Sequence, residues 1–443
     1  MDDIKVKGDT AMLDFVKKQP PARLIAVAFL IVILIGSLIL SLPFSVKEGK
    51  ELSYIDALYT SASAVCVTGL LTVDAYDTFT AVGQTVIALL IQIGGLGVAV
   101  IGAGIILAVG KKMDLKSRNL VSEAMNLDAG RGAVRFIKTA FLITAVIEIT
   151  GALLSFFVFI RDYPLKRALG LSIFHSIASF NNAGFDIFGG SQSLTGYKDD
   201  LFLNVVTMLL IILGGLGFLV IREAVQKRFS FRKLSMHSKT VITVSAALTL
   251  VGAILIFITE EISVLGAIFS SVSTRTAGFT TFSFGSFTEA GRLVVCALMI
   301  IGASPGSTGG GIKTTTFFVI LKGIGASATG KSERAFRYSI PKDAFRKATM
   351  IALIAAALIF TSSFFICLIE NDLALSDVLF EMSSAFATVG LSTGITPGLS
   401  TASKLISIIM MYIGRLGPMC VATLWYFSKG ERVSYPEGNI SVG

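Results

Sequence analysis

The amino-acid sequence predicts an all-α polytopic membrane protein, and three observations support this prediction. The 443-residue chain is 53% hydrophobic and only 15% charged, with a mean hydropathy of +0.78. A soluble domain carries about 25% charged residues. Apolar stretches long enough to cross a bilayer recur along the chain, and basic residues gather between them. Lipid therefore replaces water as the main solvent of this fold.

Eight apolar stretches have the length that a transmembrane helix needs. They lie at 22–42, 79–109, 134–160, 201–221, 240–258, 291–321, 344–369 and 403–427. The first is too long for the apolar part of a cleaved signal peptide, so we interpret it as a membrane span.

Five segments outside these stretches are basic and together hold 27 of the 38 Lys and Arg residues. They are residues 1–23, 111–138, 222–239, 322–347 and 429–443. The positive-inside rule places all five, and with them both termini, in the cytoplasm. Nucleic-acid binding is the alternative, but short basic loops without interleaved aromatic residues do not favour it.

Between the basic segments lie four units, each with a long apolar stretch, a shorter amphipathic stretch and a second long one. Their bounds are 22–110, 134–226, 240–322 and 344–428. Three crossings per unit would place successive basic segments on opposite sides of the membrane. Two crossings and one re-entrant helix keep them on one side. We therefore predict eight transmembrane spans and four re-entrant helices, with pseudo-fourfold symmetry around one pore.

The four short stretches align without gaps on Gly69, Gly184, Gly278 and Gly390. Non-helical backbone at membrane depth occurs only where it is buried in protein or borders water. Glycine allows a backbone conformation in which successive carbonyl groups face one side, where they replace the water shell of a cation. A turn at the tip of a hairpin explains a single copy equally well, but four aligned copies favour an ion filter.

Each predicted ion-binding segment contains the glycine, the two residues before it and the one after it. The segments are Val67, Thr68, Gly69 and Leu70; Asn182, Ala183, Gly184 and Phe185; Thr276, Ala277, Gly278 and Phe279; and Thr388, Val389, Gly390 and Leu391.

The stretch IIGASPGSTGGGIKTTTF at 300–317 resembles a phosphate-binding P-loop but misses its spacing, because Ile312 separates Gly311 from Lys313. Proline and repeated glycines do not continue a helix undisturbed. We predict a flexible break that borders the pore and obstructs it. The predicted gate residues are Gly302, Ala303, Ser304, Pro305, Gly306, Ser307, Thr308, Gly309, Gly310, Gly311, Ile312 and Lys313, together with Arg415.

Arg415 lies in the last apolar stretch, where the first two units have Gly95 and Gly215. A charge inside a span usually faces the bundle interior or water. We expect Arg415 to project into the cation path and to donate hydrogen bonds to carbonyls of the break. A structurally paired arginine is the alternative.

Several other polar residues have simpler interpretations. We expect Glu148 to pair with another unit and Arg275 to brace the filter from behind. Two histidines and four dispersed cysteines indicate neither a metal site nor a disulfide, and no catalytic constellation is present.

The filter motifs resemble those of the Trk/Ktr/HKT superfamily of potassium transporters, and the likeness is nearest to the bacterial KtrB type of membrane subunit. The motifs are AVCVTGL at 64–70, FNNAGFD at 180–186, STRTAGFTT at 273–281 and FATVGLST at 386–393. The resemblance covers about 22–428 and implies four M1–P–M2 units in one chain, with 302–313 as the intramembrane gate. It also implies potassium selectivity, because in plant relatives a serine in place of the first filter glycine accompanies sodium preference. Further implications are a homodimer in the cell membrane and a cytosolic ring of RCK-type nucleotide-binding subunits.

The predicted function is channel-like potassium uptake without an organic cofactor, with sodium coupling undecided by the residues. One alternative is a secondary cation transporter with alternating access, a class that also uses broken helices at the bilayer midplane. The other is a membrane enzyme in which Lys313 acts on a phosphate group.

Overall fold

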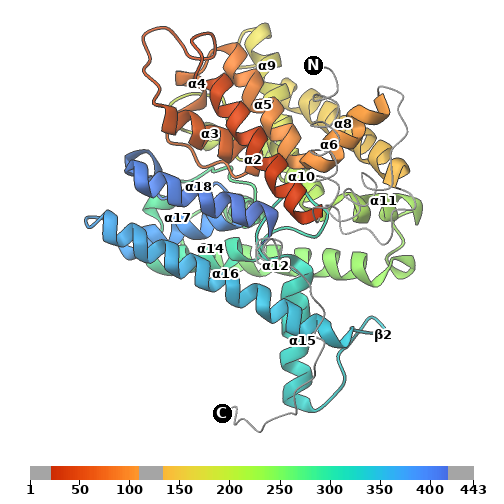
Figure 1. The fold of residues 1–443 in the computed structure, drawn as a ribbon. Coiled ribbons are helices and arrows are strands. Elements are labelled where there is room, and N and C mark those ends of the chain that lie inside the picture. Colours follow the sequence, from red (N-terminus) through yellow and green to blue (C-terminus); the bar gives the residue numbers. More distant parts are fainter. Residues whose placement is uncertain (1–20, 109–132, 418–443) are drawn as a thin grey trace, which may run out of the picture.

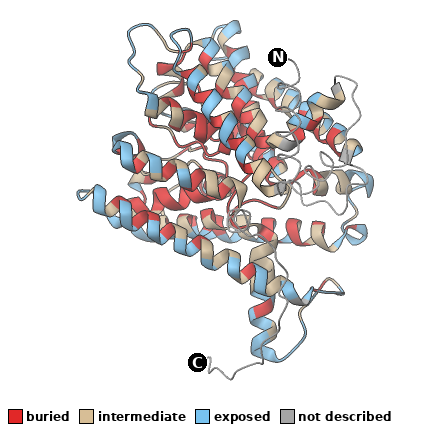
Figure 2. Cartoon of the chain, viewed as in Figure 1, coloured by how far each residue is buried: buried red, intermediate tan, exposed pale blue. Residues whose placement is uncertain are grey.

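The computed structural model describes residues 21–108 and 133–417, and this part of the chain is almost entirely helical (Figure 1). Four long apolar helices have the length and composition of membrane spans, and up to six spans result if each of two bent helix pairs counts as one. The long helices are α2 (Pro21–Leu40), α8 (Ala133–Phe159), α12 (Met236–Thr259) and α16 (Lys342–Ile369). Their outer faces expose large apolar side chains, as expected where lipid is the solvent (Figure 2).

A shorter helix follows each long one and is buried in its C-terminal half. These helices are α3 (Tyr54–Cys66), α9 (Leu165–Phe180), α13 (Val264–Ser273) and α17 (Leu375–Ala387). Serine caps begin two of them: the Ser53 hydroxyl accepts a hydrogen bond from Asp56 N–H, and Ser263 caps α13 in the same way. Each short helix ends three to five residues before one of the four aligned glycines, so its C-terminus points at the non-helical segment that follows.

The second long helix of each unit is interrupted. The helices are α5 (Ala81–Leu96) with α6 (Val98–Ala108), α10 (Leu201–Leu216) with α11 (Phe218–Gln226), α14 (Glu289–Ile300) with α15 (Thr314–Thr329), and α18 (Thr401–Leu416). The first two pairs bend by 99° and 98° at Gly97 and Gly217, whose φ angles are +87° and +89°.

The stretches at 79–109 and 201–221, which the sequence predicts as spans, are therefore each broken into two helices within the described residues. A glycine at positive φ ends the helical hydrogen-bond ladder without changing the hydropathy of the stretch. The sequence predicted only the break at 302–313, which contains a proline and several glycines.

The remaining elements are short. They are α4 (Ala75–Thr78), four 3₁₀ turns at Thr195–Tyr197, Phe231–Lys233, Phe284–Ser286 and Thr396–Gly398, and the antiparallel pair β1 (Arg334–Ala335) and β2 (Tyr338–Ser339). This hairpin is the one addition to the all-α prediction within the described ranges. It follows α15, which projects from the rest of the bundle (Figure 1).

Two ion pairs connect short helices to the second long helix of the preceding unit. Lys404 of α18 lies 2.8 Å from Asp56 of α3, and Arg292 of α14 lies 3.0 Å from Asp377 of α17. Both acids stand in the first helical turn, where the helix dipole favours negative charge. The first of these pairs joins the last unit to the first. Together with the hydrogen bond between Tyr59 Oη and Ser407 Oγ (2.9 Å), it closes the four units into a ring.

We expect Arg292→Met to lower the free energy of unfolding by about 1–3 kcal/mol, because it leaves the half-buried Asp377 carboxylate without its cation. Thermal unfolding in detergent measures the loss. Arg161→Met is the matched control, since Arg161 is 63% exposed and 3.7 Å from Asp200, and such surface pairs contribute under about 1 kcal/mol. Equal losses of unfolding free energy in both variants would contradict a stabilising role of the ion pair between Arg292 and Asp377.

Candidate functional site

The four aligned glycines meet in a closed ring. A Cβ atom on Gly69 would lie 2.5 Å from the Ala183 carbonyl oxygen, and one on Gly184 would lie 2.9 Å from that of Ala277. The ring continues from Gly278 to the Val389 oxygen at 2.5 Å, and Gly390 meets the Thr68 oxygen to complete it. Real Cβ atoms essentially never approach this closely, so only glycine fits at these four places. Segments far apart in the sequence thus lie side by side around one ring.

The backbone of the ring is left-handed at two places in each segment. The glycines have φ angles of +94°, +67°, +78° and +94° in chain order. Positive φ recurs two residues earlier, at Val67 (58°), Asn182 (58°), Thr276 (73°) and Thr388 (51°). For β-branched residues this conformation is a true outlier that costs about 1–3 kcal/mol and persists only when the surroundings enforce it. Such strain commonly marks functional sites.

Serines of the short helices hold this backbone in place. Ser63 Oγ accepts the Gly69 N–H at 3.0 Å, and Ser384 Oγ accepts the Gly390 N–H at 3.1 Å. Because an amide plane points its N–H and C=O in opposite directions, these bonds turn the carbonyls of Thr68 and Val389 away from the serines and toward Gly390 and Gly278 of the neighbouring segments. The sequence-based prediction of the site included neither serine, although both precede their glycine by six positions.

The other predicted filter residues are buried as well. The large side chains after the glycines pack into the apolar core: Leu70, Phe185 and Phe279 in the main cluster and Leu391 in a second one. The site therefore presents backbone to the axis, while its side chains anchor it in the bundle.

Three glycines of the second helices allow those helices to touch the short ones. A Cβ on Gly94, Gly214 or Gly414 would overlap the backbone carbonyl oxygen of Val65, Phe180 or Phe386, respectively. The aligned Gly302 differs, because its nearest contact is the Gly310 carbonyl of its own break.

Residues 301–313 form a non-helical loop directly beside the ring. Ideal Cβ atoms on Gly309 and Gly310 would overlap the hydroxyl oxygens of Thr276 and Thr388. The side-chain amide of Asn182 lies 3.1 Å from Thr308 Oγ1. The loop thus contacts three of the four converging segments.

Backbone hydrogen bonds attach this loop to the bend between α10 and α11. Ser304 N–H donates to the Gly215 carbonyl at 3.1 Å, and Thr308 N–H donates to that of Gly214 at 3.4 Å. In return, Phe218 N–H donates to the Gly306 carbonyl at 3.2 Å. The bend and the loop are therefore one hydrogen-bonded assembly.

Two positively charged side chains, those of Arg415 and Lys313, also hold the loop. The Arg415 guanidinium donates to the carbonyls of Thr308 and Gly94, and to that of Gly95 at 3.4 Å. Lys313 Nζ donates to the Gly309 carbonyl at 2.7 Å. Arg415 consequently links the loop to the break after α5.

Glu148 and Arg275, two further polar residues that the sequence singled out, form hydrogen bonds between elements. Glu148 accepts hydrogen bonds from Gln92 at 3.2 Å and Asn181 at 2.9 Å, so it joins the first two units through amides. Arg275 donates to the Ser245 carbonyl of α12 at 2.7 Å. A buried carboxylate that the sequence reading missed, Glu381, accepts a hydrogen bond from the Ser392 hydroxyl just beyond the ring.

These features define a class: a polytopic membrane protein whose core is a ring of four backbone segments, with a loop against it. A family model described as TrkH, cation transport protein, matches residues 18–241 and 229–430. The chain therefore belongs to the TrkH family of cation transport proteins.

Individual relatives span nearly the whole chain. The Ktr system potassium uptake protein B of Bacillus subtilis is 38% identical over 98% of both chains. The potassium/sodium uptake protein NtpJ of Enterococcus hirae is 36% identical over 96% of this chain and 98% of its own. The crystal structure of the potassium transporter TrkH from Vibrio parahaemolyticus shares the fold, with a TM-score of 0.69 at 18% identity over 90% of this chain and 85% of that one.

Asp186 follows the ring in the loop between α9 and α10, and the structure predicts a pH dependence for it. Burial raises the pKa of Asp186 to about 7, and the negative charges of Asp74 and Asp77 act in the same direction. An ordinary aspartate has a pKa of about 3.9. The folded state thus favours the neutral acid, and this contribution to stability is present below about pH 4 and is lost as the pH rises through 7.

We expect thermal stability in detergent to fall between pH 5 and pH 8, and Asp186→Asn to reduce that fall. Asp199→Asn, at an exposed position of the same loop, removes an equal charge and should leave the slope unchanged. An identical slope in wild type and Asp186→Asn would show that Asp186 does not titrate in this range.

Proposed function

We propose that this chain carries potassium into the cell through a channel-like path along the axis of the glycine ring. The observation that carries the proposal is the set of four carbonyl groups, of Thr68, Ala183, Ala277 and Val389, each lying against the glycine of the preceding segment in the ring. Carbonyls held in this way replace the hydration shell of a monovalent cation. The names of the relatives, potassium uptake and potassium/sodium uptake proteins, support this ion class.

The proposed topology has eight spans and four re-entrant helices in four M1–P–M2 units, with both termini in the cytoplasm of the cell membrane. The order of long helix, short helix and interrupted helix recurs four times within the described ranges, which supports this arrangement. The three buried glycine contacts between second and short helices support it further. The four units repeat in the same orientation, whereas alternating-access transporters commonly contain inverted repeats. This arrangement favours a channel-like mechanism over alternating access.

The loop at 301–313 is the proposed gate, and the described conformation is the obstructed one. Its contacts with Thr276, Thr388 and Asn182 place it against the ring, and Arg415 fixes it there. A cation near the path also raises the electrostatic barrier for another cation. Opening requires the loop to leave these partners.

The proposals of sodium coupling and of partner subunits are supported only by the names of the relatives. The potassium/sodium name of NtpJ supports sodium as a second ion, while the Ktr system names support a further subunit. We propose a homodimer that binds a cytosolic, nucleotide-binding RCK-type ring on its basic face.

We expect Gly69→Ser to raise sodium uptake relative to rubidium uptake severalfold, because a side chain here displaces the Ala183 carbonyl from the ring. Liposomes that hold the purified chain allow both fluxes to be measured. Gly49→Ser is the matched control: Gly49 also has a positive φ of +78°, but its Cβ position is open. An unchanged flux ratio in the Gly69 variant would remove this residue from the filter.

Arg415→Gln and a deletion of residues 307–310 should each increase rubidium uptake roughly fivefold or more, because charge-assisted hydrogen bonds contribute about 1.5–3 kcal/mol each. Arg346→Gln, in the first turns of α16, loses the same charge away from the loop and is the control. Unchanged or lower uptake in the deletion variant would argue against a gate.

A further inference from the structure

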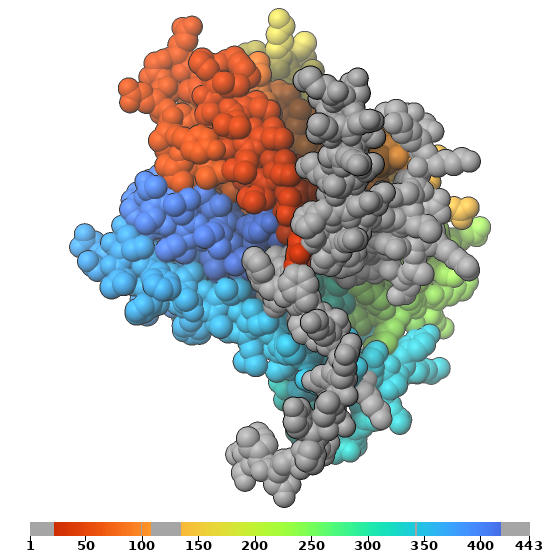
Figure 3. Space-filling model, viewed as in Figure 1, coloured from red at the N-terminus to blue at the C-terminus, as the bar shows by residue number. Residues whose placement is uncertain are grey.

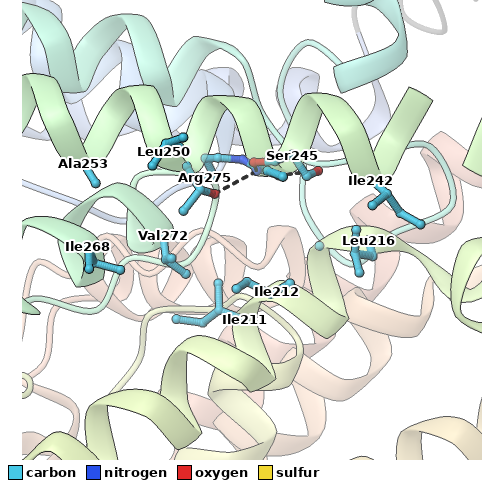
Figure 4. Close-up of a pocket in the computed structure, with 13 residues that line it drawn as sticks. Ile211, Ile212, Leu216, Ile242, Ser245, Leu250, Ala253, Ile268, Val272 and Arg275 are labelled. Carbon is cyan, nitrogen blue, oxygen red and sulfur yellow. Dashed lines mark hydrogen bonds between the residues drawn. The ribbon is translucent and has the colours of Figure 1, made fainter. Parts of the chain in front are cut away.

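A pocket lies between α10, α12 and α13 (Figure 4). Its volume is about 450 Å³, within the range of about 300–1,000 Å³ that small-molecule sites occupy. Its walls are almost wholly apolar, with Ile211, Leu250, Ala253 and Val272 among them. A cavity with such walls stays dry, so water does not fill it.

The charged residue at the pocket does not make it polar. Arg275 turns its guanidinium toward α12, where it donates to the Ser245 carbonyl and to Ser245 Oγ at 3.0 Å (Figure 4). The Arg275 guanidinium is therefore hydrogen-bonded to α12, and the pocket itself is lined by apolar groups.

The pocket is continuous with the surface that lipid covers. Leu250 is 64% exposed, and Ile254 and Ile258 continue the same exposed face of α12. In a chain with this composition, such a face contacts acyl chains. An empty cavity beside lipid forfeits the dispersion contacts that a chain segment would supply. The occupant that the surroundings offer is an acyl chain.

The boundary where the pocket lies lacks the ion pair found at two other boundaries between units. Asp56 and Asp377 each stand thirteen residues before a ring glycine and pair with the fourth residue of the preceding second helix. At the α10–α13 boundary, these positions hold Leu265 and Asn204, which carry no charge. Asn204 instead donates to carbonyls of its own unit, those of Tyr197 and Asp200. No ion pair therefore crosses the boundary at this position, and the pocket lies between apolar side chains of the two units.

The inner end of the pocket coincides with the attachment point of the loop. Gly215 and Leu216 line the pocket. The Gly215 carbonyl accepts the Ser304 N–H, and the adjoining bend at Gly217 is bonded to Gly306 through Phe218. A molecule in the pocket thus packs against the same residues that hold the loop.

We propose that one acyl chain of a membrane phospholipid occupies this pocket and stabilises the obstructing position of loop 301–313. The effect of the acyl chain on the loop rests on the gating function proposed above, whereas the lipid site itself does not. Because the occupant fits the bend in its loop-bound arrangement, it binds this state better than an open one, and it shifts the population toward the obstructed state.

The first test locates the lipid and needs no transport. The full chain is placed in nanodiscs with a phosphatidylglycerol that carries a diazirine in its acyl chain, and the photo-adducts are mapped by mass spectrometry. We expect adducts at Ala253 and Ile268 to exceed those at lipid-facing Leu142 and Phe360 severalfold. Ala253→Trp, which fills the pocket, should abolish the excess, and Val251→Trp, on the exposed face of the same helix, should not.

Two outcomes of this test overturn the lipid site. Equal adduct frequencies at all four positions would show ordinary surface lipid only. Labelling at Phe360 without labelling at Ile268 would show that a protein surface, such as a second copy of the chain, covers the pocket.

The second test measures rubidium uptake in liposomes. Ala253→Trp and the more exposed Ala246→Trp act as permanent occupants and should lower uptake severalfold, while Val251→Trp should not. In the chain without residues 307–310, the same tryptophans should have no effect. Unchanged uptake, or an equal loss with and without the loop, would overturn the coupling. Failure of every variant to transport would instead count against the proposed function and leave the adduct result standing.

Discussion

The structure depends on the close approach of four stretches of main chain at one axis. Each ring glycine lies so near the carbonyl of the next segment that a single added methyl group would overlap it. This constraint propagates outward. The second helices can reach the short helices only because Gly94, Gly214 and Gly414 also lack side chains, and the loop can reach the ring only through Gly309 and Gly310.

The strain at the ring is balanced by the helices behind it. Threonine and valine at positive φ are unfavourable alone. The hydrogen bonds that the Gly69 and Gly390 N–H groups donate to the Ser63 and Ser384 hydroxyl oxygens hold these amides in the required direction. Large side chains on either side are fully buried in the core. A rigid frame of this kind fixes carbonyl positions that a flexible loop would not maintain.

The space-filling view shows how the units fit together (Figure 3). The C-terminal unit, in blue, lies against the N-terminal one, in red, so the chain closes on itself. Closure uses the ion pair between Lys404 and Asp56 and the hydrogen bond between Tyr59 and Ser407. The boundary between the second and third units lacks such a pair and carries the apolar pocket, so the ring of units is held unequally around its circumference.

The sequence by itself determined the membrane class, the family and the positions of the glycines, because hydropathy, charge distribution and a fourfold repeated motif are local properties of the chain. It also indicated the break at 302–313, where a proline and five glycines make a helix unfavourable. Only the tertiary structure decided the bends at Gly97 and Gly217, since a lone glycine fits equally well into a straight apolar helix. The hydrogen bonds of Arg415 to the Gly94 and Gly95 carbonyls, the amide partners of Glu148, the bracing serines and the lipid-facing pocket were likewise decided there. Each depends on which residues from different units come within a few ångströms, and a single sequence without homologues does not encode that proximity in any local pattern.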